Sequence, residues 1–360
     1  VNQTFTRTLN TSISTLIAMI SVCVFALIFR VSNILTFAFP MVVGLVAGSY
    51  SSLCLTGTIW ATWKNRKPAA ITSALKRLPC AAKAEAVFSD FERKTEMKGL
   101  EIGISTSCYY PLETEKALIH LVKSGADCGE IFINSDSELS SEYLKEFRRV
   151  LKDKAIRIRS VHPFTSGMES LLFFSEYERR FWDGVEYYKK FFQAAAELGA
   201  SYLVFHGEKA DTKTSEDLYF ERYSCLNEEA KRFGILLAHE NVSRCRGRDP
   251  EFLERLKDAM GDDAAFVLDF KQARRAGVDY HELFRRLGTT IRHLHISDWD
   301  ENCDCLPIGK GRMDLSILIR ELQTLGYQGG MILELYRQNY GGYEELLTSL
   351  FYMKKIAEEF

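Results

Sequence analysis

The chain has 360 residues and a mass of 41.2 kDa, enough for one large α/β barrel or for two or more smaller domains. Its 46% hydrophobic content, 26% charged content and net charge of −2 exclude a disordered acidic chain and a strongly basic nucleic-acid-binding protein. The net charge of the whole chain hides a difference between its two parts. Residues 1–84 contain eight basic and no acidic residues, whereas residues 85–360 have a net charge of −10. The sequence therefore predicts two parts with different surroundings.

Residues 1–67 contain two long apolar segments. The first runs from Ile13 to Phe29 and the second from Ile34 to Trp60, and neither contains a charged residue. Each is close to the roughly 20 apolar residues that a membrane-spanning helix requires. Three basic residues follow at once: Lys64, Arg66 and Lys67. The positive-inside rule places that end in the cytoplasm, so we predict a two-helix transmembrane hairpin with spans at about 13–29 and 34–60.

The amino-acid sequence of these segments resembles that of a known family. VNQTFTRTLNTS (residues 1–12) and GLVAGSYSS (residues 44–52) are similar to the last two transmembrane segments of SecF, an accessory subunit of the bacterial protein-export translocase. The resemblance covers about residues 1–67. It implies a multi-pass protein of the inner membrane and contact with Sec translocase subunits. A complete SecF has further spans, and this chain begins with Val1 rather than Met, so we expect the natural start to lie upstream.

Residues 68–96 are rich in Ala and Lys and predict a cytoplasmic linker. Met97 then opens a segment that would serve as an independent start. Two alternatives follow: a natural fusion, or a barrel made separately from Met97, which would be cytoplasmic and would make the fusion an artefact of gene prediction. The chain has nine cysteines at irregular spacing and no CxxC motif. This pattern predicts free thiols in a reducing compartment.

From Met97 to Phe360, short apolar runs alternate with amphipathic stretches, some of which begin at a predicted N-cap (Asp183, Asp249 and Asp314). Eight candidate strands recur about every 33 residues, the length of one βα unit. They are Leu100–Ser105, Glu130–Asn134, Ile156–His162, Tyr202–His206, Ile235–Glu240, Ala265–Asp269, Ile291–Ile296 and Met331–Leu335. Eight such units predict a closed (β/α)8 TIM barrel. The alternative is an open doubly wound sheet, which the missing GxGxxG after the first strand disfavours.

Polar side chains recur at the carboxyl ends of the predicted strands, where barrel enzymes place their catalytic groups. They are His162, His206, Glu240, Asp269, His295 and Glu334. Glu334 lies within the apolar run Met331–Leu335, and a carboxylate buried there requires a cation. Three converging carboxylates and one imidazole suit a single divalent ion, Mn²⁺ or Mg²⁺, with Zn²⁺ or Co²⁺ as alternatives. We predict that Glu240, Asp269, His295 and Glu334 bind this ion.

These strand-end residues make residues 97–360 resemble the xylose isomerase-like TIM barrels. That group includes sugar phosphate isomerases and epimerases and AP endonuclease family 2. The family's Glu and Asp after strands five and six, its HxxD after strand seven and its Glu on strand eight match the four predicted ligands. LPIGKGRMD (residues 306–314) resembles the family's glycine turn.

The resemblance implies enediol chemistry on a sugar or sugar phosphate. Glu240 and Glu334 would be the catalytic residues that exchange protons with the two faces of the substrate, while Asp269 and His295 mainly hold the metal ion. The predicted substrate contacts are His162, His206, Asp298 and Arg337.

Two departures from the family separate this chain from its endonuclease branch, which binds three zinc ions. Gln272 stands where a DxxH histidine is expected, and Cys305 stands where a histidine precedes the glycine turn. Together with the negative net charge, they favour a sugar isomerase or epimerase over an enzyme acting on nucleic acid. Two further alternatives remain: a SecF-type translocase subunit with a passenger barrel, and an inactive binding barrel.

Overall fold

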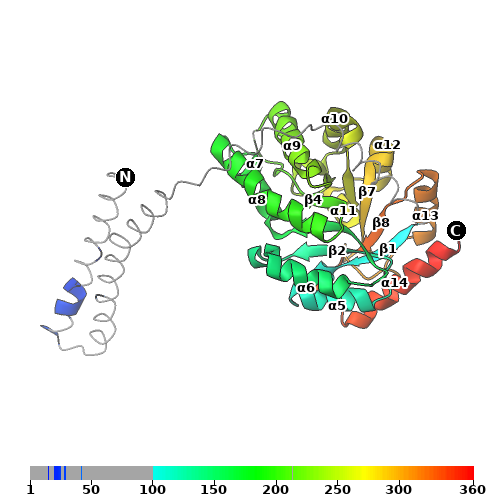
Figure 1. Ribbon diagram of the computed structural model, residues 1–360, viewed down its shortest axis with the longest axis horizontal. Helices are drawn as coiled ribbons and strands as arrows, with labels where there is room; N and C mark the ends of the chain where they lie inside the picture. The colour runs from blue at the N-terminus through cyan, green and yellow to red at the C-terminus, as the bar shows by residue number, and fades with distance from the viewer. Residues whose placement is uncertain (1–14, 16–19, 26–27, 30–41, 43–99, 213) are drawn as a thin grey trace. The chain divides into compact units, whose positions relative to one another are not determined.

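The computed structural model describes residues 15, 20–25, 28–29, 42, 100–212 and 214–360 (Figure 1). The chain divides into two compact units, Val1–Ala82 and Lys83–Phe360. The predicted hairpin, the linker 68–96 and both predicted domain boundaries fall almost wholly outside the described residues, so they stay predictions. Within the described part of the chain, no helix is both long and apolar enough to cross a membrane.

Eight parallel strands form a closed barrel in the order of the sequence, because β1 pairs with β2 on one side and with β8 on the other. The strands are β1 (Glu101–Ser105), β2 (Cys128–Ile133), β3 (Arg157–Pro163), β4 (Tyr202–Phe205), β5 (Leu236–Glu240), β6 (Phe266–Asp269), β7 (Ile291–Ile296) and β8 (Gly330–Leu333). Each overlaps one predicted strand. The predicted TIM barrel is therefore confirmed and the open sheet is excluded.

Helices follow the strands and surround the barrel (Figure 1). They are α5 (Thr114–Lys123), α6 (Ser141–Leu151), α7 (Glu169–Phe173), α8 (Glu178–Glu197), α9 (Glu216–Lys231), α10 (Pro250–Met260), α11 (Phe270–Ala276), α12 (Tyr280–Leu287), α13 (Leu315–Thr324) and α14 (Tyr343–Glu358). Asp249 and Asp314 accept backbone N–H groups at the starts of α10 and α13, as predicted. The prediction for Asp183 is wrong, because α8 begins five residues earlier and buries Phe181 in the core.

The barrel wall separates two sets of buried side chains. Outward-facing residues of the strands pack with the helices in the main hydrophobic core, which includes Leu203, Leu237 and Leu268. The alternate residues of β4, β5 and β6, together with the residue just before β6, form a second, smaller apolar cluster: Tyr202, Val204, Leu236, Ala238, Ala265 and Val267. Because side chains alternate along a strand, the next residues of this inward-facing row are His206, Glu240 and Asp269. The fold therefore directs these three polar groups to the carboxyl end of the barrel.

Candidate active site and metal centre

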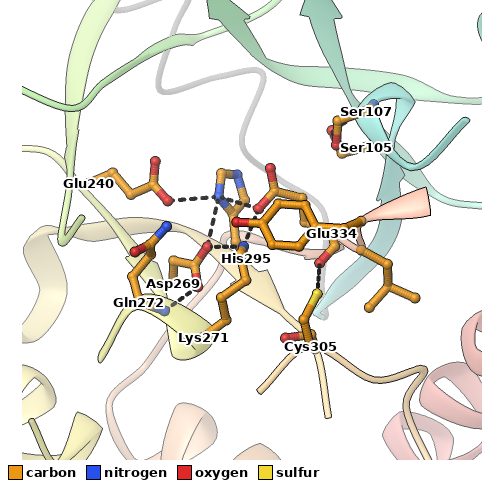
Figure 2. Close-up of polar contacts among 12 residues, drawn as sticks. Ser105, Ser107, Glu240, Asp269, Lys271, Gln272, His295, Cys305 and Glu334 are labelled. Atoms are coloured by element: carbon orange, nitrogen blue, oxygen red, sulfur yellow. Dashed lines mark hydrogen bonds and ion pairs between the residues drawn. The ribbon is translucent and has the colours of Figure 1, made fainter. Parts of the chain in front are cut away.

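The four predicted metal ligands come together at the carboxyl ends of β5 to β8. Each offers one donor atom, and the four atoms lie within 4.8 Å of one another. His295 is central, with its Nδ1 atom 3.5 Å from Glu240 Oε1, 3.9 Å from Asp269 Oδ2 and 3.6 Å from Glu334 Oε2. Figure 2 shows Glu240 and Glu334 approaching His295 from opposite sides. The structure therefore brings the four predicted residues together, and their binding of a metal ion stays a prediction.

His295 is oriented by a residue that the sequence analysis missed. Its Nε2 atom donates to Glu130 Oε2 over 3.0 Å, and Glu130 lies fully buried in β2. Glu130 also accepts hydrogen bonds from the hydroxyl groups of Ser105 and Ser160. A carboxylate that fixes the far nitrogen of a histidine is a common second layer of metal sites. Glu130 could have been found by the signal that identified Glu334, an acidic residue within an apolar strand.

The donor set fits a divalent cation. The buried Nδ1 atom of His295 has no hydrogen-bond partner, although it faces three carboxylates. Burial lowers the pKa of His295, but Glu130, Glu334 and Glu240 outweigh it and hold that pKa well above its usual value. Burial and the neighbouring Glu240 and Glu334 raise the pKa of Asp269 to about 6, although Lys271 opposes the rise. A cation in contact with Nδ1 would replace a proton there and would neutralise the carboxylates.

Lys271 is the second residue that the sequence analysis missed. Its side chain is only 3% exposed, and its Nζ atom forms ion pairs with Asp269 Oδ2 and, over 2.6 Å, with Glu334 Oε2 (Figure 2). The sequence feature that could have indicated Lys271 is its position two residues after Asp269, the aspartate that ends β6. Gln272, which replaces the family's histidine, is turned to Ser243, whose N–H and hydroxyl groups donate to its Oε1 atom.

Two predicted substrate contacts lie beside Glu240. The Nε2 atom of His206 is 2.8 Å from Glu240 Oε2 and 3.0 Å from His162 Nε2. Burial lowers the pKa of His162 to about 4, whereas Glu240 outweighs burial and raises the pKa of His206. Glu240 thus favours the charged form of the His206 imidazole, whereas burial favours the neutral form of His162.

The backbone at His206 is held by Glu169, which no sequence pattern indicated. Glu169 Oε2 accepts the N–H groups of His206 and Gly207 over 2.7 and 2.6 Å, and its other oxygen accepts the hydroxyl of Tyr188. Burial raises the pKa of Glu169 to about 8. This carboxyl group fixes the turn after β4 and thereby the position of His206.

The other two predicted substrate contacts lie outside the cluster. Asp298 is fully buried, and its carboxylate accepts four backbone N–H groups of the loop that follows β7, those of Trp299, Gly309, Gly311 and Met313. Asp298 therefore holds the glycine turn. Arg337 donates to the carbonyl groups of Tyr340 and Gly341. A substrate contact for either residue stays a prediction.

Comparison with family models divides the chain as the sequence does. Residues 119–355 match the model described as xylose isomerase-like TIM barrel. Residues 1–66 match the model described as protein export membrane protein SecD/SecF, C-terminal. Both resemblances drawn from the sequence are therefore confirmed.

Two relatives represent the two parts. An uncharacterized protein of Mycobacterium leprae is 25% identical over 262 residues, which are 65% of this chain and 88% of that protein. The protein translocase subunit SecDF of Bacillus subtilis is 40% identical over 67 residues, which are 19% of this chain but only 8% of that protein.

Solved structures share the barrel. A D-tagatose 3-epimerase-like protein is 23% identical with a TM-score of 0.58, covering 72% of this chain and 98% of that one. An IolI protein with a bound zinc atom is 18% identical with a TM-score of 0.60, covering 72% and 99%. At these identities the likeness establishes the fold.

Proposed function

The chain belongs to the xylose isomerase-like TIM barrel family, and on this premise we propose that it is a divalent-metal-dependent isomerase or epimerase of a sugar or sugar phosphate. One observation carries the proposal. The unpartnered Nδ1 atom of His295 faces the carboxylates of Glu240, Asp269 and Glu334, inside the barrel end where such enzymes place their chemistry. The D-tagatose 3-epimerase-like protein and the zinc-containing IolI protein, which share the fold, support the same class of substrate and cofactor.

The proposed chemistry assigns separate tasks to the residues. A divalent cation held by Glu240, Asp269, His295 and Glu334 supplies a Lewis acid for the negative charge that develops on the substrate oxygens. Burial raises the pKa of Glu240, but His206 and His295 outweigh it and hold that pKa well below the usual range. Lys271 and His295 likewise outweigh burial and lower the pKa of Glu334. Both carboxylates are therefore available as bases at neutral pH.

Glu240 and Glu334 approach His295 from opposite sides, so a substrate between them would present one face to each (Figure 2). One carboxylate removes the proton next to the carbonyl group, and the other returns a proton. Return to the same carbon gives an epimer, and return to the neighbouring carbon gives an isomer. His206 and His162, beside Glu240, orient the substrate hydroxyl groups.

Proton exchange with solvent tests this proposal directly. The full chain, supplied with Mn²⁺, should place deuterium from D₂O on the carbon next to the carbonyl of a ketose or ketose phosphate, with its epimer or aldose as product. Proton NMR detects both events, and the same chain treated with a chelator is the control. A metal-loaded chain that exchanges no proton in any ketose or ketose phosphate would overturn the proposal.

A second cluster favours one alternative. His162, His206 and Glu240 also place three donor atoms within 4.8 Å of one another. A further ion there is the arrangement expected of an AP endonuclease-like phosphodiesterase. The net charge of −10 over residues 85–360 opposes nucleic-acid binding, because phosphate contacts require Lys and Arg. We therefore place this function second.

We infer that residues 1–67 attach the barrel to the bacterial inner membrane, with the barrel in the cytoplasm and Sec translocase subunits as neighbours. The match of residues 1–66 to the SecD/SecF model supports this inference. The full chain should stay in the membrane pellet after an alkaline carbonate wash, whereas a chain that starts at Met97 should be released. Antibodies against the barrel should detect one full-length polypeptide in native membranes. A barrel-sized band in the supernatant alone would contradict the inference and indicate separate synthesis from Met97.

A further inference from the structure

Lys271 reaches the carboxylate cluster because of where α11 begins. Asp269 ends β6 and also caps α11, since its Oδ1 atom accepts the N–H group of Gln272 over 2.9 Å. The first turn of the helix thus carries Lys271 back over the end of the strand. Its Nζ atom then contacts Asp269 Oδ2 and Glu334 Oε2, and the side chain is only 3% exposed.

The ammonium group uses the oxygen atoms that a metal ion requires. Asp269 Oδ2 and Glu334 Oε2 are also the oxygens that face His295 Nδ1, at 3.9 and 3.6 Å. A divalent ion at a bonding distance of about 2.0–2.2 Å from these donors would share both oxygens with the ammonium. Two cations that share two oxygens lie only a few ångströms apart, and in a buried site such charges repel strongly.

We propose that Lys271 and the divalent ion compete for Asp269 and Glu334, so that the ion binds only after the ammonium group has withdrawn. This inference rests on the proposed metal-dependent function and adds a regulatory element to its site. In the metal-free protein Lys271 supplies the positive charge that the buried carboxylates require. The barrel can then fold before the ion binds, and occupancy of the site follows the concentration of free metal.

An aromatic ring lies beside the Lys271 ammonium group and would stay within its reach after displacement. The ring of Tyr336 has its centroid 5.5 Å from Lys271 Nζ, and Tyr336 is 37% exposed. Arg275 fixes this ring by donating to its hydroxyl over 2.9 Å, and Arg275 is itself held by two hydrogen bonds to Asp304. The partly exposed ring of Tyr336 thus adjoins Lys271 and also carries the Arg275 guanidinium, whose central carbon lies 5.3 Å from the ring centroid.

Direct measurement of Mn²⁺ binding tests the competition. Isothermal titration of the full chain should show that Lys271→Met binds Mn²⁺ at least tenfold more tightly than the wild type. Lys271→Arg, which keeps the charge, should bind no more tightly than the wild type. Lys209→Met, which removes an exposed lysine of the β4–α9 connection, is the matched control and should leave the affinity within twofold. Equal or weaker binding by Lys271→Met would overturn the inference.

A second measurement uses the wild-type chain and does not depend on the folding of a variant. An amine-acylating reagent, followed by peptide mass spectrometry, should label Lys271 slowly without metal and at least several-fold faster with saturating Mn²⁺. Unchanged or slower labelling with Mn²⁺ bound overturns the competition and leaves the proposed function intact. If neither the wild type nor Lys271→Met binds Mn²⁺, Co²⁺ or Zn²⁺, the competition and the metal-dependent function both fail.

Discussion

Replacing either of the two proposed catalytic carboxylates should lower kcat by about 10²–10⁴-fold while the barrel stays folded, because general acid–base groups contribute rate factors of this size. The variants are Glu240→Gln and Glu334→Gln, which keep the shape of each side chain and remove its charge. Such a loss corresponds to about 3–5 kcal/mol of transition-state stabilisation. Steady-state kinetics on the ketose found by deuterium exchange measures it.

The two variants should also differ from each other. The variant that retains the proton-removing carboxylate should still exchange the substrate proton with D₂O without forming product, whereas the other variant should do neither. Metal content is measured alongside, because both residues are also predicted ligands and a lost ion would mimic a lost base. Glu301→Gln removes an exposed acidic residue from the loop after β7 and should leave kcat unchanged. Full activity in Glu240→Gln with metal bound would remove Glu240 from the mechanism.

Metal should also stabilise the fold, and this effect should depend on His295. An ion present at about 100 times its Kd adds about 2.7 kcal/mol to the free energy of unfolding. For a domain of this size the gain corresponds to a rise in Tm of roughly 5–10 °C. His295→Gln should abolish the rise, because it removes the nitrogen that faces the carboxylates. Thermal unfolding, with and without Mn²⁺, measures the shift.

His293→Gln is the matched control for this experiment. His293 lies in the same strand and contacts Glu130, at 3.3 Å. It shares a separate group of three close donor atoms with Glu130 and His295, but it belongs to neither the predicted ligand set nor the predicted substrate contacts. Both variants should be less stable without metal, since each loosens the contacts of a buried carboxylate. The metal-induced rise in Tm should persist in His293→Gln alone. A wild-type chain that gains no stability from Mn²⁺, Co²⁺ or Zn²⁺ would contradict the metal site.

Elemental analysis of the same samples separates the remaining alternatives. About one ion per chain supports the isomerase or epimerase. Two or three zinc ions would indicate that His162, His206 and Glu240 hold a further ion, and the endonuclease-like function would then move to first place. No ion under any loading condition would leave an inactive binding barrel or a passenger on a translocase fragment.

The barrel could be predicted from the sequence because each of its eight units carries its own local signals. An apolar run of strand length, an amphipathic stretch and a cap or glycine recur together, and short-range geometry then leaves few arrangements. The start of α8 could not be predicted in this way. Asp183 has the chemistry of an N-cap, but burial of Phe181 against the core extends the helix across it.

The sequence by itself predicted the parallel barrel, and it named four residues and two histidines whose side chains the structure brings close together at one end of the barrel. Alternation along a strand fixes which residues face inward, and closure brings the strand ends together. Only the tertiary structure decided what each charged group contacts. In the structure Lys271 forms ion pairs with Asp269 and Glu334, and Glu130 accepts a hydrogen bond from His295. The carboxylate of Asp298 accepts backbone N–H groups of the loop that contains the glycine turn. Lys271 and Glu334 are 63 residues apart and His295 and Glu130 are 165 residues apart, so these two pairings form only through the packing of the whole barrel.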